Sequence, residues 1–151
     1  MYPNKENSLS RILAIDFGLK RIGLALTDPL LTFAYPFETI NNDPKVFDKL
    51  DVIIKEKEVS EILLGFPGND RQGKTSIIND LEKFKNRLEQ KYKIKIVLWD
   101  ESYTSVMAKR KVIESVTKKS RRKDKGLLDQ NSAAIILQEY LELIREEKRI
   151  A

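Results

Sequence analysis

After a polar stretch at residues 1–10, the chain has three short apolar runs, and helical and strand-like segments then alternate. Segments 12–17, 22–27 and 33–40 are typical of strands joined by short turns. Further strand-like segments, 61–66 and 92–101, are separated by helical stripes. Strands that follow one another directly can pair antiparallel, whereas strands separated by helices pair in parallel through crossovers. This order predicts an α/β fold with a mixed five-stranded sheet flanked by helices.

Proline and capping residues set the expected bounds of several elements. Pro36 places the third strand at an edge of the sheet or at a bulge, because proline cannot donate a ladder hydrogen bond. Asp43 and Pro44 fit the N-cap and the first position of a helix. A helix is also expected at 105–115, and a last one from Leu127 to about Lys148.

Composition excludes several classes of chemistry. The 151 residues include no cysteine and no histidine, which rules out disulfides, zinc ribbons and triads that depend on histidine. Catalysis would have to rest on carboxylates, other polar side chains or a bound metal. We expect a flexible stretch at 1–10 and one domain over 11–148. No segment is typical of a signal peptide or a membrane span, so a cytoplasmic protein is expected.

The positive charge is concentrated in one segment. The chain carries a net charge of +5, and segment 109–125 holds nine basic and two acidic residues. Such a distribution favours a polyanionic partner. Within it we expect a mobile basic linker over 117–126, in which Arg121, Arg122 and Lys123 contact phosphates, although a solvated charge run is the plainer alternative.

Acidic side chains stand at the ends of the elements predicted to be buried. Asp16 ends the first strand, and Asp100 and Glu101 end the last one. Asp129 begins an apolar helical stripe that continues at Ala133. Each acid has a structural alternative: Asp16 as a strand terminator, Asp100 or Glu101 as a helix cap, and Asp129 as an N-cap. Ligands gather at the carboxyl ends of parallel strands, which would bring Asp16 and Glu101 to one edge.

A cluster of carboxylates has a specific electrostatic requirement. Three such groups repel one another unless they are protonated or bridged by a cation. Oxygen ligands of this kind suit Mg²⁺ or Mn²⁺, which also accept water and substrate phosphate. The acids therefore indicate a divalent metal site.

The loop after the fourth strand fits a phosphate-binding pattern. Segment 68–75 reads Gly-x-x-x-x-Gly-Lys-Thr between a strand and a helix. No clear second acidic motif of a nucleotide hydrolase accompanies it. We therefore assign Lys74 and the start of this helix to a nucleic-acid phosphate, with nucleotide hydrolysis as a lesser alternative.

Four motifs together resemble one known family. "AIDFGLKRIGLALTDP", "LLGFPGNDRQGKTS", "WDESYTS" and "DQNSAAIILQEYL" occur in order over roughly residues 10–145. They are similar to the YqgF/RuvX family, small bacterial proteins related to the RuvC Holliday junction resolvases. The resemblance implies an RNase H-like fold. It also implies a metal-dependent nuclease, a hydrolase of phosphodiester bonds, that matures the 5′ end of pre-16S rRNA.

The resemblance also assigns residues. It implies that Asp16, Glu101 and Asp129 are the catalytic metal ligands, holding two Mg²⁺ or Mn²⁺ ions. Lys20 and Arg21, in the turn after the first strand, are then expected to contact phosphates. Thr104 keeps the family's register and is expected at the nucleic acid. The family's arginine at position 102 is a serine here, so a substrate contact is not expected at that position.

Other functions fit parts of the same pattern. A DNA junction resolvase on this fold would cut two strands symmetrically and so act as a dimer. A non-catalytic RNA-binding factor of ribosome assembly would need no metal. An actin-like nucleotide binder would require two such domains. We expect structured RNA, pre-16S rRNA above all, as the partner, with DNA junctions as the alternative. We expect no membrane partner, and a monomer or weak homodimer.

Overall fold

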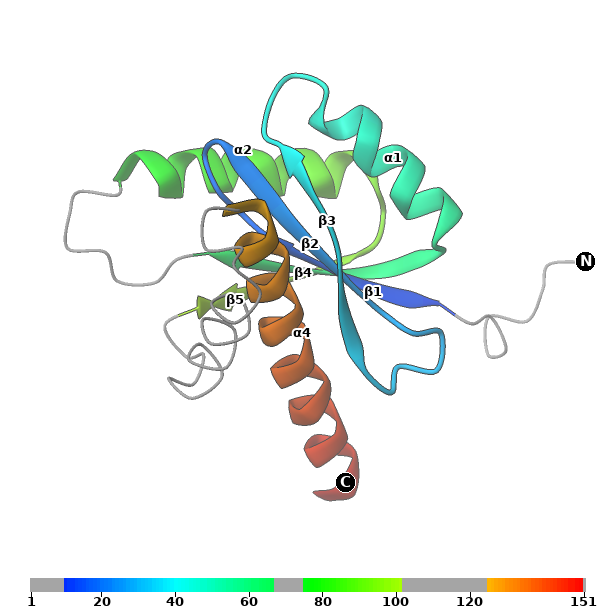
Figure 1. Ribbon diagram of the computed structural model, residues 1–151. Coiled ribbons are helices and arrows are strands. Elements are labelled where there is room, and N and C mark those ends of the chain that lie inside the picture. The colour runs from blue at the N-terminus through cyan, green and yellow to red at the C-terminus, as the bar shows by residue number, and fades with distance from the viewer. Residues whose placement is uncertain (1–9, 67–74, 102–124, 151) are drawn as a thin grey trace, which may run out of the picture.

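The computed structural model describes residues 10–66, 75–101 and 125–150, without the side chains at 75, 76, 125–130 and 150. Its strands and helices follow the predicted order (Figure 1). The elements are β1 (Arg11–Asp16), β2 (Arg21–Thr27), β3 (Ala34–Asn41), α1 (Val46–Glu56), β4 (Val59–Phe66), α2 (Thr75–Lys91), β5 (Lys95–Asp100) and α4 (Lys125–Ile150). The helix expected at 105–115 lies outside the described residues.

The five strands form one mixed sheet in the spatial order β3-β2-β1-β4-β5. β2 pairs antiparallel with β1 and with β3, whereas β4 pairs in parallel with β1 and with β5. The predicted mixed five-stranded sheet is therefore confirmed. Because β1, β4 and β5 run in the same direction, their carboxyl ends meet at one edge of the sheet.

Strand β3 is the outermost strand on one side of the sheet, as β5 is on the other, and it carries Pro36. The register between β2 and β3 shifts, since Leu24 pairs with Glu38 and Ala25 pairs with Pro36. One residue of β3 is thus left over, which defines a bulge. Both predicted environments of Pro36, an edge strand and a bulge, are confirmed.

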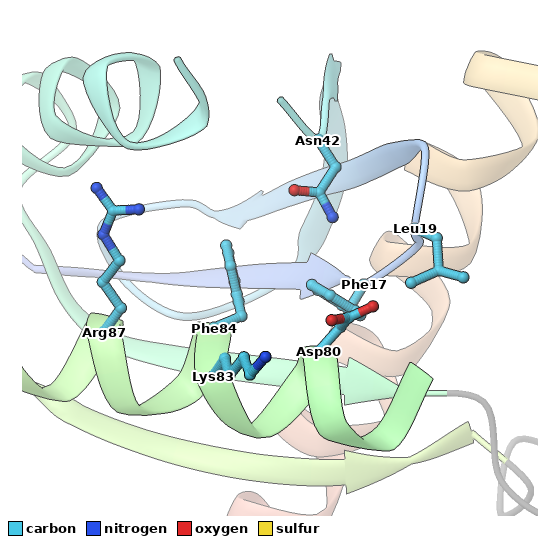
Figure 2. A pocket seen from close by; sticks show the side chains of 7 residues that line it. All are labelled: Phe17, Leu19, Asn42, Asp80, Lys83, Phe84 and Arg87. Carbon is cyan, nitrogen blue, oxygen red and sulfur yellow. The ribbon is translucent and has the colours of Figure 1, made fainter. Parts of the chain in front are cut away.

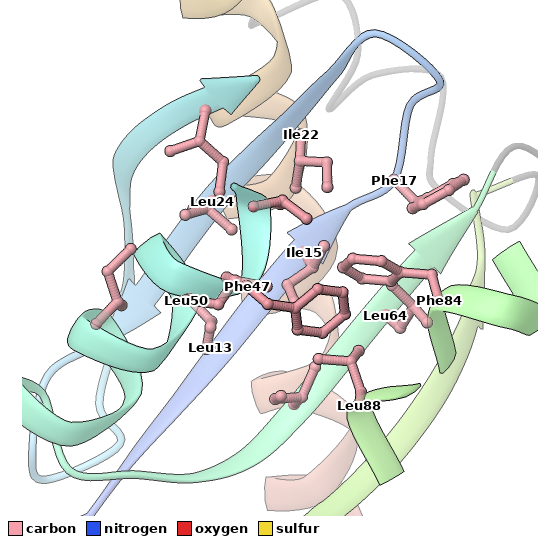
Figure 3. Packing of buried hydrophobic residues seen from close by; sticks show 14 of the residues in the cluster. Leu13, Ile15, Phe17, Ile22, Leu24, Phe47, Leu50, Leu64, Phe84 and Leu88 are labelled. Atoms are coloured by element: carbon pink, nitrogen blue, oxygen red, sulfur yellow. The ribbon is translucent and has the colours of Figure 1, made fainter. Parts of the chain in front are cut away.

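Helices α1 and α2 cover one face of the sheet and enclose the larger of two hydrophobic clusters (Figure 3). Leu13 and Ile15 of β1, and Phe17 just after it, belong to this cluster. The Phe84 ring of α2 packs against Phe17 and against Phe47 of α1, with ring centroids 5.1 and 5.3 Å apart. These aromatic contacts tie the two helices to each other and to the end of β1.

Helix α4 packs on the other face, mainly across β2 and β3 (Figure 1). Its buried residues include Ala133, Ile136 and Tyr140, which meet Ile12 and Ala14 of β1. Two further contacts join α4 to the start of β3 and the loop before it. The Ala34 N–H donates to Gln138 at 2.9 Å, and Arg145 donates to the carbonyl oxygen of Leu31 at 3.2 Å.

Each face also buries one tyrosine hydroxyl against a carboxylate. Tyr140 of α4 donates to Glu61 at 2.6 Å, and Tyr92, just after α2, donates to Asp51 of α1. Burial, and after it the neighbouring carboxylate, raises the pKa of both tyrosines well above 10. The hydrogen bond from Tyr92 lowers the pKa of Asp51 in turn, although partial burial opposes it.

Two helices begin where the capping pattern did not place them. α1 begins at Val46, because the Asp43 carboxylate accepts the backbone N–H of Lys45 at 2.9 Å and closes a turn ahead of the helix. α4 begins at Lys125, two residues before the predicted start. Across the described residues, no helix combines the length and apolar character needed to cross a lipid bilayer.

Candidate functional site

The carboxyl ends of the three parallel strands form the edge where the predicted acids were placed. Asp16 is the last residue of β1 and pairs in register with Gly65 of β4. Gly65 in turn pairs with Trp99 of β5, and Glu101 lies two residues further along the chain. The strand order therefore brings Asp16 and Glu101 to one edge, on either side of β4.

Alternation along the strands decides which face these acids share. Ile12 and Ala14 of β1 pack toward α4, so Asp16, the next residue of that series, lies on the α4 side. Val97 and Trp99 of β5 pack in the same cluster, and Glu101 continues their series. Both acids thus belong to the face that α4 covers.

Gly65 leaves the space that Glu101 occupies. A Cβ atom at Gly65 would lie 3.4 Å from Glu101 Oε1, and it would collide with the Cδ1 atom of Ile136 from α4. Any side chain at position 65 would therefore press on α4 through Ile136, and its Cβ atom would be in contact with the carboxylate. A glycine inside a strand often marks such a close approach.

Glu101 holds a buried oxygen without a donor. Within the described part of the chain, Glu101 Oε1 is fully buried and accepts no hydrogen bond. A buried carboxylate oxygen left in this state is strongly unfavourable unless a donor or a cation reaches it. The Nε1 atom of Trp99, on the same face, also lacks a described partner. The indole N–H can only donate, so of the two atoms only the Glu101 oxygen is a candidate metal ligand.

The third predicted acid, Asp129, lies on helix α4. It is the fifth residue of the helix, which excludes the N-cap alternative, since α4 begins at Lys125. Helical spacing places it one turn before Ala133, on the stripe that packs against the sheet. Its side chain lies outside the described residues. No cluster of three metal-binding side chains is found among the described residues, where Asp16 and Glu101 are the two predicted members present.

Lys20 and Arg21 lie at the same edge, in and just after the turn that joins β1 to β2. Lys20 is exposed, and Arg21 is half-buried with a polar contact of its own. Asn42 holds this turn: its side-chain amide donates to the Gly18 carbonyl at 2.7 Å, and its backbone N–H donates to the Lys20 carbonyl at 2.9 Å. The remaining predicted contacts fall outside the described residues or side chains: Lys74, Thr104, Arg121, Arg122 and Lys123.

The sequence reasoning missed two residues that shape this edge. Gly65 carried a signal, because it is the one glycine in the apolar run "EILLGF". Asn42 carried none, since its role depends on β3 returning beside the β1–β2 turn. Both act on the shape of the site rather than on its charge.

The strand arrangement defines the class of fold. A solved structure of Thermus thermophilus RuvC, in complex with a Holliday junction substrate, matches with a TM-score of 0.57. The match covers 90% of this chain and 96% of that chain at 10% sequence identity, so it concerns the fold alone. The predicted RNase H-like fold is thereby confirmed.

The sequence itself places the chain in a family. Residues 10–143 match the family model described as "RuvX: Holliday junction resolvase", and the chain belongs to this family. It is 40% identical to a protein of Sulfurihydrogenibium sp. (strain YO3AOP1), over 89% of this chain and 91% of that one. It is 38% identical to a protein of Endomicrobium trichonymphae, over 92% and 100%. Both relatives are named "Putative pre-16S rRNA nuclease".

Proposed function

We propose that the protein is a metal-dependent nuclease whose active site lies at the carboxyl edge of β1, β4 and β5. The buried Glu101 Oε1, which has no described donor, is the observation that carries this proposal. It lies against Gly65, the register partner of Asp16, on the face covered by α4. A carboxylate oxygen in that state is suited to a cation, which would offset the cost of its burial.

The donor set fits a hard divalent ion. Asp16, Glu101 and Asp129 would hold Mg²⁺ or Mn²⁺, which prefer carboxylate oxygens and keep water ligands. Two such ions, when bound, supply an activated water and stabilise the leaving oxygen of a phosphodiester. The chain's own contribution is to position two carboxylates at strand ends and the third on α4, which packs over them. Lys20 and Arg21, beside Asp16, are suited to bind the flanking phosphates.

Structured RNA is the substrate that we favour, and pre-16S rRNA in particular. Both named relatives carry pre-16S rRNA in their names and match nearly the whole chain. The basic segment 109–125 is suited to a polyanion of any sequence. A role at the 5′ end of pre-16S rRNA is therefore the first to test.

Cleavage of DNA junctions is a second candidate, because the matching family model is described as a Holliday junction resolvase. Such an enzyme would have to place two active sites on one junction and therefore act as a dimer. A substrate panel of pre-16S rRNA fragments and four-way DNA junctions, combined with the oligomeric state in solution, separates the two candidates.

The proposal is tested by cleavage and by metal-dependent melting of three variants. Asp16→Asn and Glu101→Gln should each lower cleavage by more than about 100-fold. Loss of a residue that binds the metal directly should reduce activity at least as much as loss of a residue that only orients such a ligand. Mn²⁺ should raise the Tm of the wild type by mass action, and this rise should shrink in both variants and in Asp129→Ala.

Asp100→Asn is the matched control, because Asp100 lies beside Glu101 in the chain and points to the other face of the sheet. It should keep most of the cleavage activity and the full response to Mn²⁺. Equal Mn²⁺ responses in all four variants and the wild type would contradict the metal site. Metal-independent RNA binding without cleavage would instead favour a non-catalytic factor.

A further inference from the structure

A pocket of about 260 Å³ lies on the α2 side of the sheet, behind the candidate metal site (Figure 2). It is bounded by the turn after β1, by the residue after β3 and by one flank of α2. Phe17, at its base, follows Asp16 directly in the chain. Asp16 and Phe17 are neighbours in the chain but point to opposite faces of the sheet, so a nucleic-acid strand held at Asp16 reaches this pocket by passing over the tip of β1.

The base of the pocket is apolar. The rings of Phe17 and Phe84 pack with centroids 5.1 Å apart, and Leu19 forms a wall while remaining 50% exposed. A cavity of about 150 Å³ is known to hold a benzene ring, so this pocket has room for a planar base. Phe17 and Phe84 are only 4% and 7% exposed, so Leu19 supplies most of the apolar surface that is open to a nucleobase.

The exposed Leu19 is held in place by its turn. Asn42 hydrogen-bonds the carbonyl groups on both sides of it, those of Gly18 and Lys20. Gly18 is packed so closely that a Cβ atom there would collide with the carbonyl oxygen of Arg21. The turn is thus fixed in a form that presents Leu19 at the surface, where an isolated leucine gains nothing for stability.

Charged groups stand along the α2 flank of the pocket. Lys83 and Arg87 are one helical turn apart, and Arg87 lies over the ring of Phe47, 4.1 Å from its centroid. Among the described residues, neither Lys83 nor Asp80 takes part in an ion pair. Cations above an apolar base are suited to a phosphate, while the Asp80 carboxylate can accept an amino group of a base.

We propose that this pocket binds one unpaired nucleotide of the substrate, adjacent to the phosphodiester that is cleaved. The base lies against Leu19, above Phe17 and Phe84, its phosphate meets Lys83 and Arg87, and Asp80 faces the edge of the base. The inference rests on the proposed nuclease function, because it assigns the pocket to the strand that enters the carboxylate edge. It adds a position at which an unpaired, unstacked base is selected over a duplex.

The test measures binding of fluorescent single-stranded RNA and DNA of about 12 nucleotides, with Ca²⁺ in place of Mg²⁺. One position at a time is made abasic. For the wild type, loss of the base at one position should weaken binding about tenfold. Leu19→Ser should weaken binding of the intact strand by a similar factor and remove the dependence on that position. The Leu19→Ser variant should then bind the strand with that abasic position no more weakly than either change does alone.

Lys83→Ala should lower the log–log dependence of affinity on salt by ~0.7, as for one lost phosphate contact on a single strand. Lys85→Ala is the matched control, because Lys85 lies on the other flank of α2 and pairs with Glu89 at 3.3 Å. It should leave the slope unchanged. All three changes are at the surface of the turn or helix, and equal Tm values would exclude unfolding as a cause.

Two outcomes would overturn the pocket assignment: abasic positions that act independently of Leu19, or equal salt slopes for the Lys83 and Lys85 variants. In that case a protein partner is the better occupant of this surface. Failure of the nuclease function looks different. If Asp16→Asn cleaves normally, the metal site is wrong, yet the coupling between Leu19 and one base position can still be measured.

Discussion

The two faces of the sheet are built from the same strands and differ in what they bury. The face under α1 and α2 holds the larger cluster, with rings and branched side chains packed against one another. The face under α4 holds a smaller cluster and two buried polar atoms without described partners, on Trp99 and Glu101. The comparison indicates that one face supplies most of the stability, whereas the other tolerates unmatched polar groups, which fits the metal site proposed there.

Alternation along β1 produces both faces from six residues. Leu13 and Ile15 enter the larger cluster, while Ile12 and Ala14 face α4. Asp16 is the next residue on the α4 side, at the point where the strand ends. A shift of one residue in register would exchange the two sets, which is why the acid and the core are specified together.

Leu63 and Leu64 allow the sharpest test of this comparison, because they are adjacent, fully buried and on opposite faces. Leu64→Ala should lower the free energy of unfolding by about 3–5 kcal/mol. Leu63→Ala should lower it somewhat less, because a single helix, α4, covers that face and can move into the cavity that the change leaves. Leu63→Ala should lower cleavage more, because α4 carries Asp129. Urea unfolding and cleavage of folded protein measure both effects. Larger loss of stability at Leu63 would break the comparison.

Gly65→Ala tests how tightly the α4 face is fitted. The new methyl group should displace Ile136, at a cost of about 1–3 kcal/mol, and lower cleavage by shifting α4. Ile136→Val removes the Cδ1 atom that the methyl group would meet. The double variant should therefore regain both stability and cleavage relative to Gly65→Ala. A double variant no more stable than Gly65→Ala would contradict the contact with Ile136.

Tyr92, which is partly buried, and Tyr140, which is buried, give a test by pH, one on each face. Their pKa values are raised by burial and by Asp51 or Glu61, so the folded state keeps protons that the unfolded state releases near pH 10. Their contribution is therefore complete below about pH 10 and is lost as the pH rises further. At neutral pH, Tyr140→Phe should cost about 0.5–1.5 kcal/mol. The Tm of Tyr92→Phe and Tyr140→Phe should fall less steeply above pH 10 than that of the wild type, and parallel curves would contradict these assignments.

Asp28 lies in the loop before β3, outside both clusters, and should give the smallest effect. Slight burial works to raise its pKa, but hydrogen bonds from Thr32 and from the backbone of Phe33 outweigh it and lower the pKa to about 2. The stability that it contributes is thus present above about pH 4 and lost as the pH falls toward 2. The Tm difference between the wild type and Asp28→Ala should shrink from about pH 6 to about pH 2.5. A constant difference would exclude the carboxylate charge as the cause.

The sequence was sufficient for the order of the elements along the chain, for a mixed five-stranded sheet and for the expectation that Asp16 and Glu101 meet at one edge. Alternation and crossover rules act locally, and the family motifs added the class of fold. It was insufficient for the start of α1, because Asp43 can cap a turn as well as a helix. It could not show that Glu101 Oε1 lacks a donor, since that depends on the register of β4 with β5 and on Ile136.

The packing of α4 across β2 and β3 has a consequence for synthesis on the ribosome. The Ala34 N–H can form its hydrogen bond only after Gln138, 104 residues later in the chain, has been synthesised. At about 5–20 residues per second, the hairpin of β2 and β3 spends roughly 5–20 s with its α4-facing side uncovered. During that interval the nascent chain exposes an apolar strand surface, which is where chaperones bind and where aggregation begins. The proposed active site, which needs Asp16 and Asp129 together, therefore cannot act before the helix that protects this surface has been made.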